Sequence, residues 1–131
     1  MNKKRVMLID DEVDYLRVTE LNLKASGRFD VLAVSDSKSI IENLYSFKPD
    51  VILLDILMPD LDGIQVCEML NRDQLGKGIP VIIVSALDSD KDRLDAYKAG
   101  IVDYLSKPAD IKVILEKIDK ALQYKGEVSD G

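Results

Sequence analysis

Short apolar runs separated by longer amphipathic stretches organise this chain. Five runs have the length of a β-strand and are rich in Val, Ile and Leu; they cover residues 5–10, 29–34, 51–55, 80–85 and 102–107. Their apolar positions are nearly continuous rather than alternating with polar ones, which is typical of strands buried on both faces. The pattern therefore predicts a sheet that other elements cover on both sides.

The stretches between these runs have the spacing of helices. The clearest lies near the end of the chain, where one apolar stripe is formed by Ile111, Ile114, Leu115, Ile118 and Leu122. A second stripe is formed by Ile40, Leu44 and Phe47, with Asp36 or Ser37 as the N-cap and Lys48-Pro49 as the end.

Three weaker helices complete the pattern. Residues 11–25 and 63–75 precede Gly27 and Gly76, and residues 88–99 have so few apolar side chains that we expect the most exposed helix there. Strands that alternate with helices predict an α/β fold. With right-handed crossovers, we expect a flavodoxin-like, doubly wound, five-stranded parallel sheet of order 2-1-3-4-5 with helices on both faces.

Length and hydropathy limit the protein class. The chain has 131 residues, which suits one ordinary domain. No stretch approaches the roughly 18 consecutive apolar residues of a membrane span, and the apolar run after the basic start is too short for a secretion signal. We therefore expect a soluble, cytoplasmic protein with no membrane partner.

Charge and missing residue types narrow the chemistry. The net charge of −6 argues against direct nucleic-acid binding by this chain. The chain has no histidine, which excludes Ser/His/Asp and Cys/His catalysis and histidine metal sites. Cys67 is the single cysteine, so we expect a buried hydrophobe and no internal disulfide. Any phosphate or metal chemistry must therefore depend on carboxylates.

Polar side chains follow four of the predicted strands. Asp10 and Asp11 end the first strand, Asp55 the third, Ser85 the fourth and Lys107 the fifth. In open α/β sheets ligands bind beyond the carboxyl ends of the strands, where the strand order reverses. Each of these residues alone has an ordinary structural explanation as a cap, a strand end or a surface charge. Their joint placement at one edge favours a functional site.

The residue types at this edge suit phosphoryl transfer. Asp10, Asp11 and Asp55 would repel one another, and a hard cation with oxygen ligands, Mg²⁺ above all, would relieve that repulsion. Lys107 adds a second positive centre and Ser85 a hydroxyl donor, which suit the charge on a transferring phosphoryl group. Asp55 is central in the set and can be the nucleophile that accepts the group as an acyl phosphate.

Four motifs in this order resemble the receiver domain of two-component response regulators. They read "LIDDE", "VILLDILMPDLDG", "VIIVSA" and "AGIVDYLSKP". The similarity covers residues 4–124, which we expect to form the receiver domain, and residues 125–131 then form a tail or the start of a linker. The resemblance implies a phosphorylation-dependent signalling switch rather than an enzyme.

The resemblance also implies a role for each site residue. Asp55 would accept a phosphoryl group from the phosphohistidine of a sensor histidine kinase or a histidine phosphotransfer protein. Mg²⁺ would be held by Asp10, Asp11, Asp55 and the backbone carbonyl of Leu57. Lys107, just before a cis peptide bond at Pro108, would contact the phosphoryl group.

A conformational switch and an output surface follow from the same resemblance. Ser85 would be drawn toward the phosphoryl group and Tyr104 would turn inward behind it, which changes the face formed by the fourth helix, the fifth strand and the fifth helix. A homodimer is a possible result of this change.

The chain departs from the commonest pattern of the family in two regions. Residues 71–80 lengthen the connection before the fourth strand, and Ala109 stands where many DNA-binding regulators have Phe. Leu57 and Leu87, each two residues after a site residue, cannot orient a water molecule. We therefore expect slow hydrolysis of the acyl phosphate.

Three other functions are compatible with parts of the pattern. A phosphorylation-independent, receiver-like interaction module would not use the site residues. A Mg²⁺-dependent phosphatase with an Asp nucleophile would need a second acid two residues later, where this chain has Leu57. A flavodoxin-like cofactor binder would need a phosphate-binding loop after the first strand, but that loop is acidic.

Overall fold

The computed structural model describes residues 3–58 and 61–130, with side chains for all of these except 61 and 124–130. Five strands form one parallel sheet in the order β2-β1-β3-β6-β7. Their bounds are β1 Lys4–Ile9, β2 Phe29–Val34, β3 Val51–Leu54, β6 Val81–Ser85 and β7 Asp103–Ser106. The predicted flavodoxin-like strand order is confirmed.

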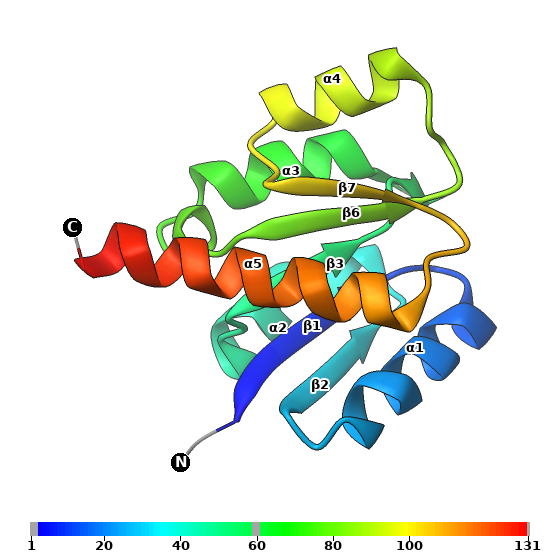
Figure 1. Ribbon diagram of the computed structural model, residues 1–131. Coiled ribbons are helices and arrows are strands. Elements are labelled where there is room, and N and C mark those ends of the chain that lie inside the picture. The colour runs from blue at the N-terminus through cyan, green and yellow to red at the C-terminus, as the bar shows by residue number, and fades with distance from the viewer. Residues whose placement is uncertain (1–2, 59–60, 131) are drawn as a thin grey trace.

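Helices cover both faces of this sheet (Figure 1). One face carries α1 Val13–Ala25 and α5 Ile111–Asp130; the other carries α2 Ile40–Phe47, α3 Gly63–Arg72 and α4 Asp90–Lys98. None of the helices within the described residues is long and apolar enough to cross a membrane.

Alternate residues of each central strand point to opposite helical layers. In β3, Val51 and Leu53 pack with α1 and α5, whereas Ile52 and Leu54 pack with α2 and α3. Both sets are almost completely buried. This explains why the sequence shows continuous apolar runs, because each side of the sheet buries its own set of side chains.

Local sequence features set where several helices begin and end. The carboxylate of Asp36 accepts from the backbone N–H of Lys38 and caps a short 3₁₀ turn, Ser37–Ser39, that leads into α2. Gly27 has φ +74° after α1, a conformation that glycine adopts without strain. Within its limits α4 buries only Ala96, in agreement with the predicted exposed helix.

Three segments differ from the sequence interpretation. The sequence pattern did not predict that Leu57–Met58 (β4) pairs with Leu61–Asp62 (β5) as a short antiparallel ladder. The third helix ends at Arg72, because the Asp73 carboxylate accepts from backbone N–H groups in the following turn. The last helix continues to Asp130, through residues expected to be a tail or linker; the domain limit at 124 stays a prediction.

Gly63 closes the loop after Asp55 through a close backbone contact. A Cβ at this position would lie 2.2 Å from the Cα of Ile56, a distance that cannot be tolerated. We expect Gly63→Ala to lower the free energy of unfolding by about 2 kcal/mol, the usual cost of overpacking, in urea denaturation. Gly78→Ala is the matched control because no atom lies within 4 Å of its added Cβ. Equal losses of stability in both variants would contradict this account.

Candidate phosphoryl-transfer site

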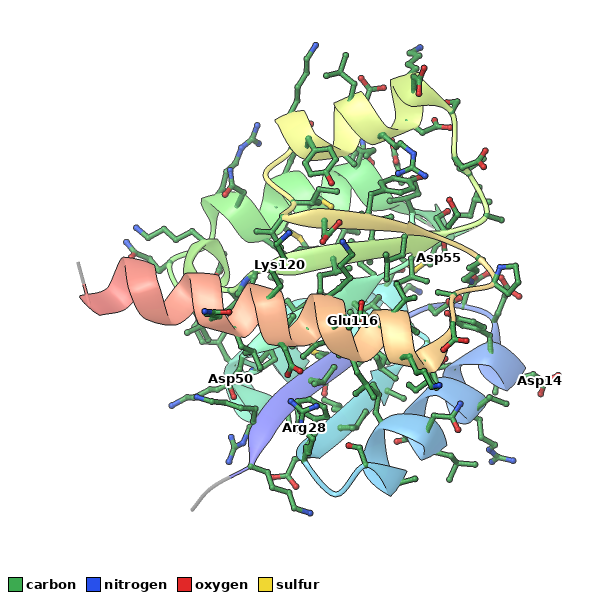
Figure 2. All side chains as sticks on the ribbon, viewed as in Figure 1. Asp14, Arg28, Asp50, Asp55, Glu116 and Lys120 are labelled. Atoms are coloured by element: carbon green, nitrogen blue, oxygen red, sulfur yellow. The ribbon has the colours of Figure 1, made fainter. Side chains whose placement is uncertain are left out.

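Backbone hydrogen bonds hold the ends of neighbouring strands together at the carboxyl edge of the sheet. The Asp10 N–H donates to the carbonyl of Val34 at 3.1 Å, and the Asp55 N–H donates to the carbonyl of Ile9 at 2.9 Å. The Lys107 N–H donates to the carbonyl of Ser85 at 2.8 Å. The sheet itself therefore fixes the positions from which these side chains extend, and Figure 2 shows Asp55 at this edge.

The three aspartates predicted from the sequence form one cluster. One carboxylate oxygen from each of Asp10, Asp11 and Asp55 lies within 4.8 Å of the others. Asp10 and Asp55 are 5% and 3% exposed, and Asp11 is half-buried. Several carboxylate oxygens in close proximity are the ligand set that Mg²⁺ prefers, so these residues fit that ion.

Lys107 is the positive charge that the structure places in this cluster. Its Nζ donates to Oδ2 of Asp10 at 2.8 Å, to Oε1 of Glu12 at 3.0 Å and to Oδ2 of Asp55 at 3.2 Å. Burial lowers the pKa of Lys107, but the hydrogen bonds that Lys107 donates to Asp10 and Glu12 outweigh that effect and leave the pKa above its usual value. The ammonium group therefore stays charged beside Asp55.

Both oxygens of Asp55 have a hydrogen-bond partner. Oδ1 accepts from the backbone N–H of Leu57 at 3.0 Å, while Oδ2 accepts from Lys107. The carboxylate is thus held in one orientation at the end of a rigid strand. The Leu57 side chain is 48% exposed next to it and offers no polar group to a water molecule. The peptide bond between Lys107 and Pro108 is cis, as the resemblance implies.

Ser85 and Tyr104 are linked through one intervening residue. The Ser85 hydroxyl accepts from the backbone N–H of Leu87 at 3.2 Å, and the Tyr104 hydroxyl donates to the Leu87 carbonyl. Burial raises the pKa of Tyr104, so its hydroxyl keeps the proton that it donates. The side chain of Tyr104 is turned inward and 4% exposed. Leu87 therefore connects the two side chains.

Arg93 packs on the Tyr104 ring. Its guanidinium carbon lies 4.9 Å from the ring centroid, and its Nη2 donates to the Ser106 hydroxyl at 3.0 Å. This contact connects α4 to β7 beside the tyrosine.

Sequence reasoning missed three residues that contact the predicted set: Glu12, Tyr15 and Arg93. Glu12 is part of the quoted "LIDDE" motif, and its contact with Lys107 could have been suspected from the motif alone. Tyr15, whose ring centroid lies 4.2 Å from the Lys107 Nζ, looks like an ordinary core position of a helix. Arg93 looks like a solvated charge. The contacts of Tyr15 and Arg93 depend on tertiary packing, which local sequence patterns do not encode.

The burial of Asp10 predicts how the stability of the protein depends on pH. Burial raises the pKa of Asp10 above its ordinary value of 3.8, despite its hydrogen bonds with Lys107 and the backbone of Glu12. The folded state then binds a proton more tightly than the unfolded state, so this group's contribution to stability is lost as pH rises from 3.8 through the folded pKa. Without Mg²⁺, the stability of Asp10→Asn relative to the parent should rise across that range, by about 1.4 kcal/mol per unit of raised pKa.

Urea unfolding at a series of pH values, with a metal chelator present, measures this difference. Asp14→Asn gives the effect of removing one exposed carboxylate from the same end of the molecule (Figure 2). A difference between Asp10→Asn and the parent that stays constant or falls with rising pH would contradict the raised pKa of Asp10.

Comparisons with known proteins agree with this geometry. Residues 6–119 match the family model described as the response regulator receiver domain. The alkaline phosphatase synthesis transcriptional regulatory protein PhoP of Bacillus subtilis is 33% identical over 129 residues, which cover 98% of this chain and 52% of that protein. The chain therefore spans about half the length of this curated relative.

Solved structures share the fold over nearly the whole chain. A CheY-like response regulator receiver domain protein from Methanospirillum hungatei JF-1 has a TM-score of 0.88 and 25% identity, covering 96% of this chain and 98% of that one. The receiver domain of the Francisella response regulator 1452 has a TM-score of 0.84 and 29% identity, covering 93% and 98%. With a parallel sheet of the same kind and the family's motifs in order, this chain belongs to the receiver domains of two-component response regulators.

Proposed function

We propose that this chain is a phosphorylation-dependent switch in which Asp55 accepts a phosphoryl group from a phosphohistidine. The observation that carries the proposal is the contact of the buried Lys107 ammonium with Oδ2 of Asp55, 3.2 Å away, inside a carboxylate cluster that fits Mg²⁺. A nucleophilic carboxylate between two positive centres is the arrangement that stabilises the charge of a transferring phosphoryl group.

The reaction transfers the group from nitrogen to oxygen. An oxygen of Asp55 attacks phosphorus, the bond between phosphorus and the donor imidazole nitrogen breaks, and an acyl phosphate forms on Asp55. Asp10, Asp11, Asp55 and the Leu57 carbonyl would hold Mg²⁺, which supplies positive charge for the phosphoryl oxygens. Lys107 would contact one of these oxygens, and the Ser85 hydroxyl would donate to another.

The switch follows from the link between Ser85 and Tyr104. Once the Ser85 hydroxyl binds a phosphoryl oxygen, the segment at Leu87 moves with it, because Leu87 is hydrogen-bonded to both side chains. Tyr104 already lies inward here, and the phosphoryl group would further favour that position. Since Arg93 of α4 packs on this tyrosine, the face formed by α4, β7 and α5 would change and bind a different partner.

The domain bounds, partners and location of this switch are proposed from its family. We propose that residues 4–124 are the functional receiver unit, that a sensor histidine kinase or histidine phosphotransfer protein donates the phosphoryl group, and that phosphorylation can favour a homodimer. The net charge of −6 supports a receiver that does not bind nucleic acid itself. The setting proposed for this signalling is the cytoplasm, and catalysis is limited to self-phosphorylation and self-dephosphorylation.

Intact mass tests the phosphoacceptor. After incubation with acetyl phosphate and Mg²⁺, the parent should gain one phosphoryl group, because its acyl phosphate forms on Asp55 alone. The matched variant Asp55→Asn should gain none, and chelation of Mg²⁺ should abolish the gain in the parent. If the parent gains no mass with this donor or with a phosphorylated phosphotransfer protein, the phosphorylation-independent interaction module becomes the better account.

The lifetime of the acyl phosphate depends on the side chain at position 57. Leu57→Asn introduces an amide that can hydrogen-bond an attacking water, and one such bond of roughly 1 kcal/mol should speed hydrolysis about three- to tenfold. Decay of the phosphorylated mass after donor removal gives the rate. Leu94→Asn is the control, since Leu94 on α4 is a leucine of similar exposure, 54% against 48% for Leu57. Hydrolysis no faster in Leu57→Asn than in Leu94→Asn would refute this role.

A further inference from the structure

All the hydrogen-bond donors of the Lys107 ammonium are occupied. A lysine ammonium has three N–H donors, and the acceptors here are the carboxylates of Asp10, Glu12 and Asp55. The Lys107 side chain is only 10% exposed, so its position is set by these contacts rather than by solvent. We propose that the first turn of α1 holds this lysine in place for phosphoryl transfer, through Glu12 and Tyr15 as positioning residues. This inference rests on the proposed function.

Of the three acceptors, Glu12 is the one that takes no direct part in the proposed reaction. Asp10 belongs to the carboxylate set that fits a metal ion, and Asp55 is the oxygen nucleophile. The hydrogen bonds from Lys107 to both must therefore rearrange during transfer. Glu12 lies outside that set, and its side chain is 61% exposed. It can keep its 3.0 Å contact with Lys107 while the other two contacts change.

The Tyr15 ring packs against the Lys107 ammonium and restricts its position. The lysine Nζ lies 4.2 Å from the centroid of the Tyr15 ring, within the range of a cation–π contact. Burial raises the pKa of Tyr15, so the ring stays neutral beside the cation. Within the described residues, the Tyr15 hydroxyl is buried and makes no hydrogen bond of normal geometry. The ring rather than the hydroxyl is therefore the part that acts on Lys107.

The two positioning residues belong to one rigid unit. Glu12 is the N-cap residue of α1, and Tyr15 lies in the first turn of that helix. The Glu12 N–H also donates to Oδ1 of Asp10 at 2.9 Å, which ties the helix start to the cluster. Lys107 comes from the opposite end of the chain, after β7. The contacts of α1 therefore fix the distance between Lys107 and Asp55, which follow different strands.

NMR relaxation of the Lys107 side chain tests, in the metal-free protein and independently of any reaction, whether Glu12 and Tyr15 hold Lys107 in place. The order parameter of its terminal methylene should fall in Tyr15→Leu and in Glu12→Gln, and Tyr15→Phe should restore it because the ring is kept. Asp14→Asn is the matched control for Glu12→Gln: it removes an exposed carboxylate that points away from the site (Figure 2). The same spectra report whether each variant is folded. Because Glu12→Gln changes an exposed side chain, we expect this variant to fold.

The rate of phosphorylation by acetyl phosphate with Mg²⁺ is the second readout. We expect a roughly three- to thirtyfold loss in Tyr15→Leu, the range from an exposed to a desolvated cation–π contact, with recovery in Tyr15→Phe, and a loss in Glu12→Gln relative to Asp14→Asn. An unchanged order parameter in Tyr15→Leu and Glu12→Gln overturns the inference, as does a lower order parameter with an unchanged rate. If the parent is not phosphorylated at all, the proposed function fails, while the order parameters still decide whether α1 holds Lys107.

Discussion

Repulsion among carboxylates at the end of two adjacent strands is the constraint on which the rest of this structure depends. Asp10 and Asp55 are almost completely buried, and Asp11 lies beside them. Negative charges so close together and so little hydrated are unfavourable unless a cation accompanies them. In the structure Lys107 provides that cation, and the same residues can accept a divalent ion. The cluster therefore depends on positive charge close to its carboxylates.

The parallel sheet makes this arrangement possible. Because all strands run in one direction, their carboxyl ends lie at one edge, and residues separated by nearly a hundred positions meet there. Backbone hydrogen bonds between Asp55 and Ile9 and between Lys107 and Ser85 keep these ends in register. Asp55 and Lys107 therefore both extend from the ends of hydrogen-bonded strands. The loops after β1, β3 and β6 leave the sheet at this same edge, beside the aspartates and Ser85.

The fold was largely predictable from the sequence because each strand is buried on both faces and so appears as a continuous apolar run. Asp10, Asp55, Ser85 and Lys107 were predictable for the same reason, since each directly ends such a run or follows it. Tyr15 and Arg93 were not found, because their importance lies in tertiary contacts between different elements. Glu12 was also missed, although it belongs to the quoted "LIDDE" motif. The short pairing of Leu57–Met58 with Leu61–Asp62 was also missed, as two-residue strands have no hydrophobic period to detect.

A crystal structure of the protein with Mg²⁺ and beryllium fluoride, which mimics a phosphoryl group, tests most directly whether Asp55 and Lys107 act on the same group. The account predicts beryllium bound to a carboxylate oxygen of Asp55, with Lys107 Nζ and Ser85 Oγ in contact with fluorine atoms and the metal ion on Asp10 and Asp11. Beryllium fluoride bound elsewhere, or bound to Asp55 while Lys107 keeps its present contacts with Asp10 and Asp55, would contradict it.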